Sequence, residues 1–231
     1  LRALTCSVLL IAVAFGAGCA SSGSNQKAAG RPKKTVLLTS ADDVRAGQEG
    51  AQSVQAEIGL LDDPALTAYV DRIGKKLLLG LPNREFAFKF AIVDQMEPNA
   101  FALPGGYIYV SRGLLALANN KDELACVIGH EITHVARRHS AQQQAVAQQQ
   151  SSFSLPMSRA ATLASYGRDM EREADTIGQR LCAAAGYDPM AMSTFMRSLD
   201  QRERLLIGHP RAATFLDTHP GSRERAAEDA I

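Results

Sequence analysis

The sequence predicts an α+β domain that is mostly helical and contains one small antiparallel sheet. Apolar residues recur at helical spacing over most of the 231 residues. Residues 86–93 instead alternate with the period of two that marks a strand. A second strand, Tyr107–Val110, follows the turn signal Pro-Gly-Gly at 104–106. With 46% hydrophobic residues, the chain has the composition of an ordinary globular protein with one core.

The N-terminal region is expected to direct secretion. A mostly apolar run at 8–17 is too short to span a bilayer comfortably, and small residues precede Cys19. This pattern resembles the bacterial lipobox, which implies a signal peptide at 1–18 and lipidation of Cys19. Ordinary cleavage and an uncleaved anchor are the alternatives. Residues 19–40 are then a polar, flexible tether with a reach of roughly 25 Å, and residues 41–231 form the folded domain.

Charge and cysteine content restrict the classes of partner and metal site. The chain has 25 Lys and Arg against 24 Asp and Glu, which is not the basic excess expected of a nucleic-acid binder. Its four cysteines are too few and too scattered for a disulfide scaffold or a cysteine-rich zinc module. Any metal ion must therefore be held mainly by histidines and carboxylates.

Helices are expected both before and after the strands in the sequence. Apolar spacing predicts helices at 42–60 and 64–79, the second starting at Asp63 and Pro64. The phenylalanines of 86–90 are expected in the core. The later helices are predicted at 114–119, 122–139, 168–185 and 189–206, with a short one after Pro220. We interpret the Gln-rich residues 142–150 either as a polar continuation of the helix that begins at 122 or as a solvated linker.

The sequence His-Glu-Ile-Thr-His at 130–134 lies inside one of these helices. Side chains four residues apart are only about 40° apart around a helix, so His130 and His134 can bind one cation. Glu131 lies on the adjacent flank, where it can reach a water molecule at the metal without being a ligand itself.

A second predicted helix offers the third ligand. Glu171 follows His134 by 37 positions and shares a helix face with Asp175. Two histidines and one glutamate with an open fourth position characterise a hydrolytic zinc site. Asp175 can accept the second ring N–H of His130. Glu173 points elsewhere on the helix and is expected at the surface. His139 is also expected there, because it is nine residues beyond His130.

Together these motifs resemble the HtpX and CAAX-prenyl-protease family of gluzincin zinc metallopeptidases. Residues 99–115 and the sequence Thr218-His219-Pro220 with Arg223 are similar to further segments of that family, and the resemblance covers about 44–228. It implies a zincin-like metallopeptidase fold, with the small sheet beside the active-site helix. The secreted form is most similar to the periplasmic BepA-like and LoiP-like lipoproteins, because the hydrophobic helices of HtpX itself are missing.

The resemblance also implies roles for individual residues. One zinc ion per chain is expected on His130, His134 and Glu171, with Glu131 as the general base of peptide-bond hydrolysis. His219 and Arg223 are the candidates for stabilising the oxyanion. The chain departs from the family pattern at Gly167, where Ser is usual, and at Cys126, where Ala is common; neither position is a metal ligand.

The expected function is cleavage of unfolded or misassembled proteins in the bacterial envelope. The expected location is the periplasm, with a lipid anchor in the outer membrane, because Ala20 rather than an Asp follows Cys19. The expected substrates are envelope or outer-membrane proteins. The alternative is a zinc-stabilised periplasmic chaperone or adaptor that binds unfolded proteins without cutting them. Glu131 favours the enzyme, because a binding module needs no carboxylate beside an open metal position.

Three finer expectations follow. An unfolded substrate is expected to add as a strand beside the 102–110 hairpin. The residues expected to line it are Ala102, Leu103, Pro104, Gly105 and Gly106. His219 is expected either to act on the oxyanion or to block the metal as a removable fourth ligand. Cys126 and Cys182 are expected either to form a disulfide or to be two small buried hydrophobic residues.

Overall fold

The computed structural model describes residues 38–151, 156–206 and 214–219. The predicted signal peptide, nearly all of the tether and the helix predicted after Pro220 lie outside the described residues, as do Cys19 and Arg223. In the described part of the chain, no helix combines the length and the apolar character needed to cross a membrane.

Three short strands form the sheet, in the order β1-β3-β2. β2 (Ala100–Leu103) pairs antiparallel with β3 (Tyr107–Ser111), and β1 (Lys89–Val93) pairs with the other side of β3 in parallel. The mostly helical α+β fold is confirmed, but the sheet is mixed rather than antiparallel. The reason is β2, which was expected only as the first arm of the 102–110 hairpin and was not counted among the strands of the sheet. A tight turn, η1 (Pro104–Gly106), joins β2 to β3, so only the far side of β3 remains for β1.

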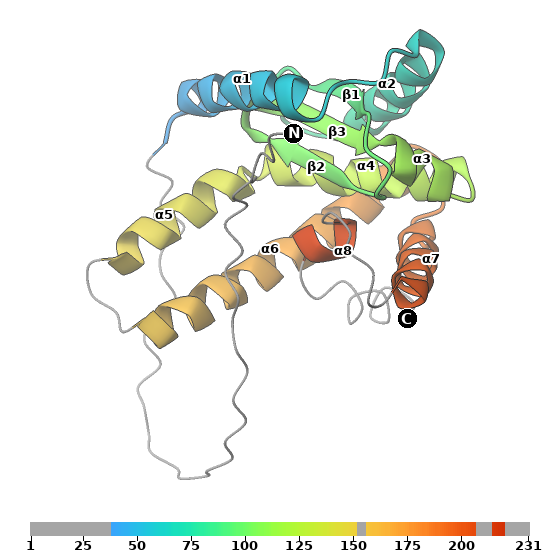
Figure 1. The fold of residues 1–231 in the computed structure, drawn as a ribbon. Coiled ribbons are helices and arrows are strands. Elements are labelled where there is room, and N and C mark those ends of the chain that lie inside the picture. Colours follow the sequence, from blue (N-terminus) through green and yellow to red (C-terminus); the bar gives the residue numbers. More distant parts are fainter. Residues whose placement is uncertain (1–37, 152–155, 207–213, 220–231) are drawn as a thin grey trace, which may run out of the picture. The chain divides into compact units, whose positions relative to one another are not determined.

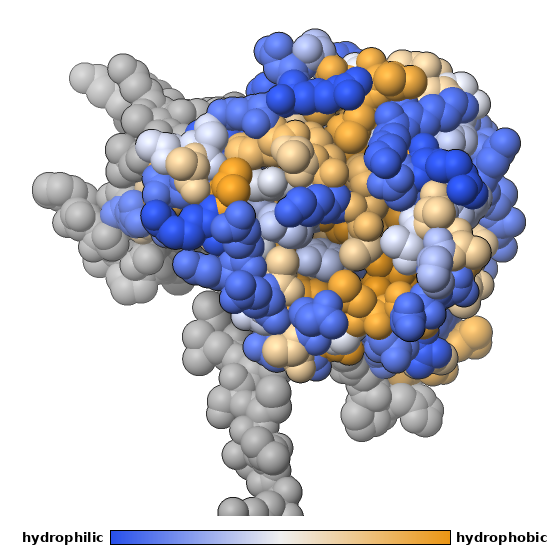
Figure 2. Space-filling model, turned by 90° about the horizontal axis from the view of Figure 1, so that it is seen from above, coloured by the Kyte–Doolittle hydropathy of each residue, from blue (hydrophilic) through white to orange (hydrophobic). Residues whose placement is uncertain are grey.

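The two faces of the sheet are covered by different helices (Figure 1). α1 (Ser40–Glu57) packs on one face, where Val54 contacts a small cluster containing Val93 and Tyr109. The opposite face, with Phe90 and Ile108, belongs to the main core. That core also contains residues of α2 (Pro64–Leu78), α4 (Lys121–Ala136) and α7 (Ala191–Leu205). Seen from the α1 side, hydrophilic and hydrophobic residues are interspersed on the surface (Figure 2).

Local signals in the sequence account for the helix starts. Thr39 and Asp42 form a capping box at the start of α1. Asp63 caps α2 directly before Pro64, as predicted. Ser111 ends β3 and caps α3 (Arg112–Leu117), and Asn120 caps α4.

A close contact between α4 and α6 (Pro156–Ala184) places the two predicted ligand helices side by side (Figure 1). Gly129 of α4 meets Gly178 of α6 at this crossing. A Cβ atom added to Gly178 would lie 2.8 Å from the backbone nitrogen of His130, which is closer than real side chains approach. The two glycines therefore allow the helix backbones to touch at the first ligand.

The helix predicted for 122–139 does not continue into 142–150. α4 ends at Ala136, and α5 (His139–Ser151) starts as a separate helix. Between them Arg138 adopts a left-handed backbone with φ 55°, a conformation that typically costs a non-glycine residue about 1–2 kcal/mol. Its guanidinium binds Asp43 of α1 and the carbonyl oxygen of Leu38, which holds the break in place.

Candidate metal centre

Four side chains from three helical elements meet beneath β2. His130 and His134 come from α4, Glu171 comes from α6, and His219 follows the short helix α8 (Phe215–Thr218). Each offers one ligand atom, and these atoms all lie within 4.8 Å of one another. The structure thus brings together the three predicted ligands and adds His219 as a fourth group.

The geometry of the three predicted ligands fits a divalent metal ion. Nε2 of His130 and Nε2 of His134 face each other at 2.9 Å. The two carboxylate oxygens of Glu171 each lie 3.5 Å from one of these nitrogens. Ring nitrogens that face one another in this way can share one cation, and two imidazoles with a carboxylate suit a first-row divalent metal.

The electrostatics of the site also favour a cation. Burial lowers the pKa of His130, but hydrogen bonds with Asp175 and Glu171 outweigh it and raise this pKa to about 10. Burial and the neighbouring histidines hold the pKa of His134 well below its usual value, so this ring is neutral. Burial opposes ionisation of Glu171, but the contact with His130 outweighs it and lowers the pKa of Glu171. The site therefore attracts positive charge, whether a proton or a metal ion.

Asp175 lies where the sequence analysis placed it. Its Oδ1 atom is 2.9 Å from Nδ1 of His130, and both side chains are buried. Because the carboxylate accepts the proton of Nδ1, Nε2 of His130 is left to face the metal position.

Glu131 lies next to the metal position but is not one of the four clustered ligands. It is only 1% exposed, and its Oε1 atom is 3.2 Å from Nε2 of His219. Its place beside the cluster suits a base that accepts a proton from water rather than a ligand.

His219 is fixed by the residues of α8. Its ring stacks on Phe215 with 4.0 Å between the ring centroids, and its Nδ1 lies 3.1 Å from the Phe215 carbonyl oxygen. Oγ1 of Thr218 lies 2.9 Å from the same nitrogen, so two groups of α8 hold the ring. Nε2 of His219 faces Oε1 of Glu131 and the cluster.

The predictions of a surface position for His139 and Glu173 are wrong. His139 is 2% exposed, and its Nδ1 lies 2.9 Å from Nδ1 of His134. Glu173 is half-buried and contacts both His139 and Arg137. The cause is the break at Arg138, which turns the chain so that His139 no longer follows the periodicity of α4. The sequence signal was limited to a histidine five residues beyond His134.

The structure places the predicted substrate residues in two different environments. Ala102 and Leu103 lie on β2, an edge strand of the sheet that packs against α4. Gly105 and Gly106 are buried, and a Cβ atom at Gly105 would lie 2.7 Å from the Cα atom of Val44 in α1. Gly105 therefore lets α1 approach the turn, and a Cβ atom at Gly106 would lie 2.5 Å from the carbonyl oxygen of Ala87.

Cys126 and Cys182 are present as buried free thiols rather than as a disulfide. A hydrogen bond with Cys126 and burial raise the pKa of Cys182. The thiol of Cys126 also donates to the carbonyl oxygen of Asp188. Since the thiolate is the form that reacts, this environment favours a protonated, unreactive Cys182.

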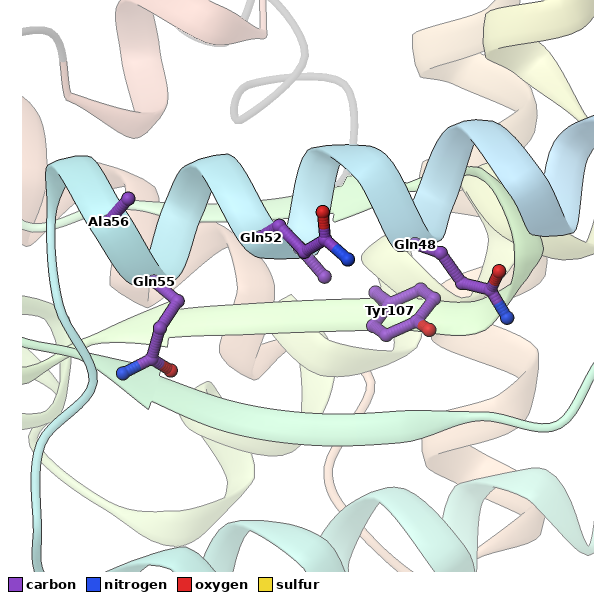
Figure 3. Close-up of a pocket in the computed structure, with 6 residues that line it drawn as sticks. Gln48, Gln52, Gln55, Ala56 and Tyr107 are labelled. Atoms are coloured by element: carbon purple, nitrogen blue, oxygen red, sulfur yellow. The ribbon is translucent and has the colours of Figure 1, made fainter.

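A separate groove lies on the α1 side of the sheet, on the face opposite α4. Its lining includes the amide side chains of Gln48, Gln52 and Gln55 on one wall and Tyr107 of β3 on the other (Figure 3). It contains none of the clustered metal ligands, so the sheet separates it from the candidate metal centre.

The fold and the site together define a metallopeptidase with an HExxH helix and a glutamate ligand on a second helix. The chain belongs to peptidase family M48, whose model matches residues 64–228. This membership agrees with the resemblance seen in the sequence motifs.

Individual relatives cover most of this chain but less of their own length. The mitochondrial metalloendopeptidase OMA1 of Schizosaccharomyces pombe is 31% identical over 198 residues, which are 78% of this chain and 58% of the relative. The beta-barrel assembly-enhancing protease of Escherichia coli K12 is 29% identical over 217 residues, or 83% of this chain and 44% of the relative. OMA1 of Arabidopsis thaliana is 34% identical over 155 residues, or 61% and 30%. The chain thus spans about half the length of the first two of these curated relatives.

Proposed function

We propose that this metallopeptidase is a zinc-dependent endopeptidase that cleaves unfolded or misassembled proteins in the bacterial envelope. The observation that carries the proposal is the buried Glu131 beside three converging ligands, below the edge strand β2. A protein that only bound unfolded chains would need no such base at the metal.

The proposed reaction is hydrolysis of a peptide bond. A zinc ion held by His130, His134 and Glu171 supplies a Lewis acid that polarises the scissile carbonyl and acidifies a water molecule. Glu131 takes the proton of the attacking water and later passes it to the leaving amine. Asp175 keeps His130 in the tautomer that a ligand requires.

We infer that the substrate pairs with β2 as an added strand. β2 is an edge of the sheet, and its backbone runs over the helix that holds His130 and His134. Pairing with a strand edge requires an extended backbone and reads side chains weakly. The proposed substrates are therefore unfolded segments of varied sequence.

The envelope location rests on the N-terminal sequence. Residues 1–19 resemble a lipoprotein signal with Cys19 as the lipidated residue. The E. coli relative is named a beta-barrel assembly-enhancing protease, which agrees with envelope or outer-membrane substrates. We propose that the enzyme is held at the outer membrane by its lipid and reaches substrates through the tether at 19–40.

The zinc-loaded protein is expected to cleave unfolded substrates much faster than folded ones. The comparison uses one protein in two states, for example disulfide-bonded α-lactalbumin and its reduced, alkylated form. Cleavage of the unfolded form is expected to be at least about tenfold faster, because only an extended segment can pair with β2. Product masses should map to many sites.

Glu131→Gln is the control in that assay. Any cleavage by this variant measures contaminating proteases and is subtracted. Equal cleavage of both forms, or cleavage of the folded form at one unique bond, would contradict the proposed substrate class. No cleavage of either form would contradict the endopeptidase itself.

Substitution of His219 is expected to raise basal proteolysis. Its ligand atom lies within 4.8 Å of those of the other three clustered residues, so it is suited to occupy the water position as a fourth ligand. If a site open to substrate is a minor state of about 10%, His219→Ala should increase turnover of an unfolded substrate about tenfold. The His219→Ala, Glu131→Gln double variant should stay inactive. A decrease of about two to three orders of magnitude would instead identify His219 as an oxyanion donor.

A further inference from the structure

We propose that His139 and Glu173 are positioning residues that orient the metal ligand His134 through a chain of hydrogen bonds. The proposal rests on the proposed function, because it takes His134 to be a ligand of zinc. It gives a role to two side chains that the sequence analysis placed at the surface.

The break after α4 brings His139 to the ligand. In a continuous helix, His139 would lie about 140° around the axis from His134 and could not reach it. In the structure the centroids of the two rings are 4.9 Å apart, with the ring planes at 80°. Arg138 takes the left-handed conformation that permits this, and Asp43 of α1 holds its guanidinium.

The direction of each hydrogen bond follows from the metal position. Nε2 of His134 faces the cluster, so a ring that binds metal there carries its proton on Nδ1. The atom beside that proton is Nδ1 of His139, at 2.9 Å, which must accept it. His139 then carries its own proton on Nε2.

The chain ends on a carboxylate that has its own cationic partner. Nε2 of His139 lies 3.3 Å from Oε2 of Glu173, and Oε1 of Glu173 lies 2.6 Å from Nη2 of Arg137. Every donor in the series meets an acceptor, so both rings are held in one tautomer and one orientation. Because His139 is 2% exposed, water has little access to compete with these bonds.

The two histidine ligands are then supported in different ways. His130 is bound directly by a carboxylate, Asp175, whereas His134 reaches the carboxylate of Glu173 through a second imidazole. Loss of an outer partner of a metal-bound histidine typically weakens metal binding by about 10- to 100-fold. We expect an effect of this size from His139.

Three variants separate hydrogen bonding from packing. His139→Phe keeps a ring but removes the acceptor, and zinc affinity should fall by about 10- to 100-fold. His139→Asn places an amide oxygen near the position of Nδ1, and its affinity should stay within about threefold of the wild type. Glu173→Ala removes the acceptor of His139 and should give an intermediate loss. Competition with a zinc-binding dye measures each dissociation constant without any peptide substrate.

The control is Glu49→Gln, an exposed carboxylate on α1 that should leave zinc affinity unchanged. Thermal unfolding of each variant in chelator shows whether the fold is retained. In the zinc-loaded wild type, long-range ¹H–¹⁵N NMR should find the proton of His134 on Nδ1 and that of His139 on Nε2. The opposite tautomer of His139 would overturn the proposal.

Equal zinc affinity in His139→Phe and the wild type would also overturn it, as would an Asn variant as weak as the Phe variant. These outcomes are distinct from failure of the proposed function. In that case the wild-type protein would bind zinc but hydrolyse no peptide, and the zinc affinities of the variants could still be compared. A wild-type protein that binds no zinc would overturn both proposals.

Discussion

Alanine at His134 is expected to remove both bound zinc and peptide hydrolysis. The substitution deletes one of three converging protein ligands and leaves Nε2 of His130 without the neighbour that faces it at 2.9 Å. A metal ion acting as a Lewis acid supplies several kcal/mol of transition-state stabilisation. Hydrolysis of an unfolded substrate should therefore fall by about four orders of magnitude or more.

Elemental analysis of the purified variant measures the zinc content directly. The wild type should contain one zinc ion per chain and lose activity in a chelator, and added zinc should restore it. The matched control is His139→Asn, another histidine substitution beside the site that we expect to retain zinc. A His134→Ala protein that keeps one tightly bound zinc ion would refute the ligand assignment.

Glutamine at Glu131 is expected to separate metal binding from chemistry. Glu131 is not among the clustered ligand atoms, so zinc content should stay at one ion per chain. Glutamine has nearly the same shape but cannot take a proton from water, so hydrolysis should fall by about two to four orders of magnitude. Elemental analysis tests whether zinc is retained, and cleavage of an unfolded substrate tests whether hydrolysis is lost. A variant that still cleaves at the wild-type rate would refute the assigned base.

The same variant distinguishes the enzyme from a chaperone in cells. If the protein is a protease of the envelope, unfolded envelope proteins should accumulate with Glu131→Gln and be recovered bound to it. If it only holds unfolded proteins, the variant should complement loss of the wild type. Quantitative proteomics of the envelope decides between these results, and Glu49→Gln serves as the control.

The metal site was largely predictable because its spacing is local. His130 and His134 are one helical turn apart, and Glu171 and Asp175 are one turn apart on the second helix. Helical periodicity is enough to place each pair on one face. The close contact between α4 and α6 is then possible because each helix has a glycine at the crossing. The structure places all four side chains within one connected group.

The features that the sequence did not predict depend on contacts between segments that are distant in the sequence. β2 has only four residues and is defined by its pairing with β3, so no long alternating pattern marks it. The break after α4 depends on Arg138 meeting Asp43, which is 95 residues away. Local propensity favours a continuous helix there, and a tertiary ion pair outweighs it. The prediction that His139 lies at the surface was wrong because it assumed that continuous helix.

The backbone contact between α4 and α6 links metal supply to the survival of the enzyme itself. An ion held by ligands from both helices, across the crossing at Gly129 and Gly178, would bind the native state and not the unfolded chain. Free zinc at 100 times its dissociation constant would stabilise the native state by about 2.7 kcal/mol. A molecule depleted of zinc therefore loses that stabilisation together with its activity. Scarcity of the metal would thus make the metallopeptidase itself prone to unfolding and degradation.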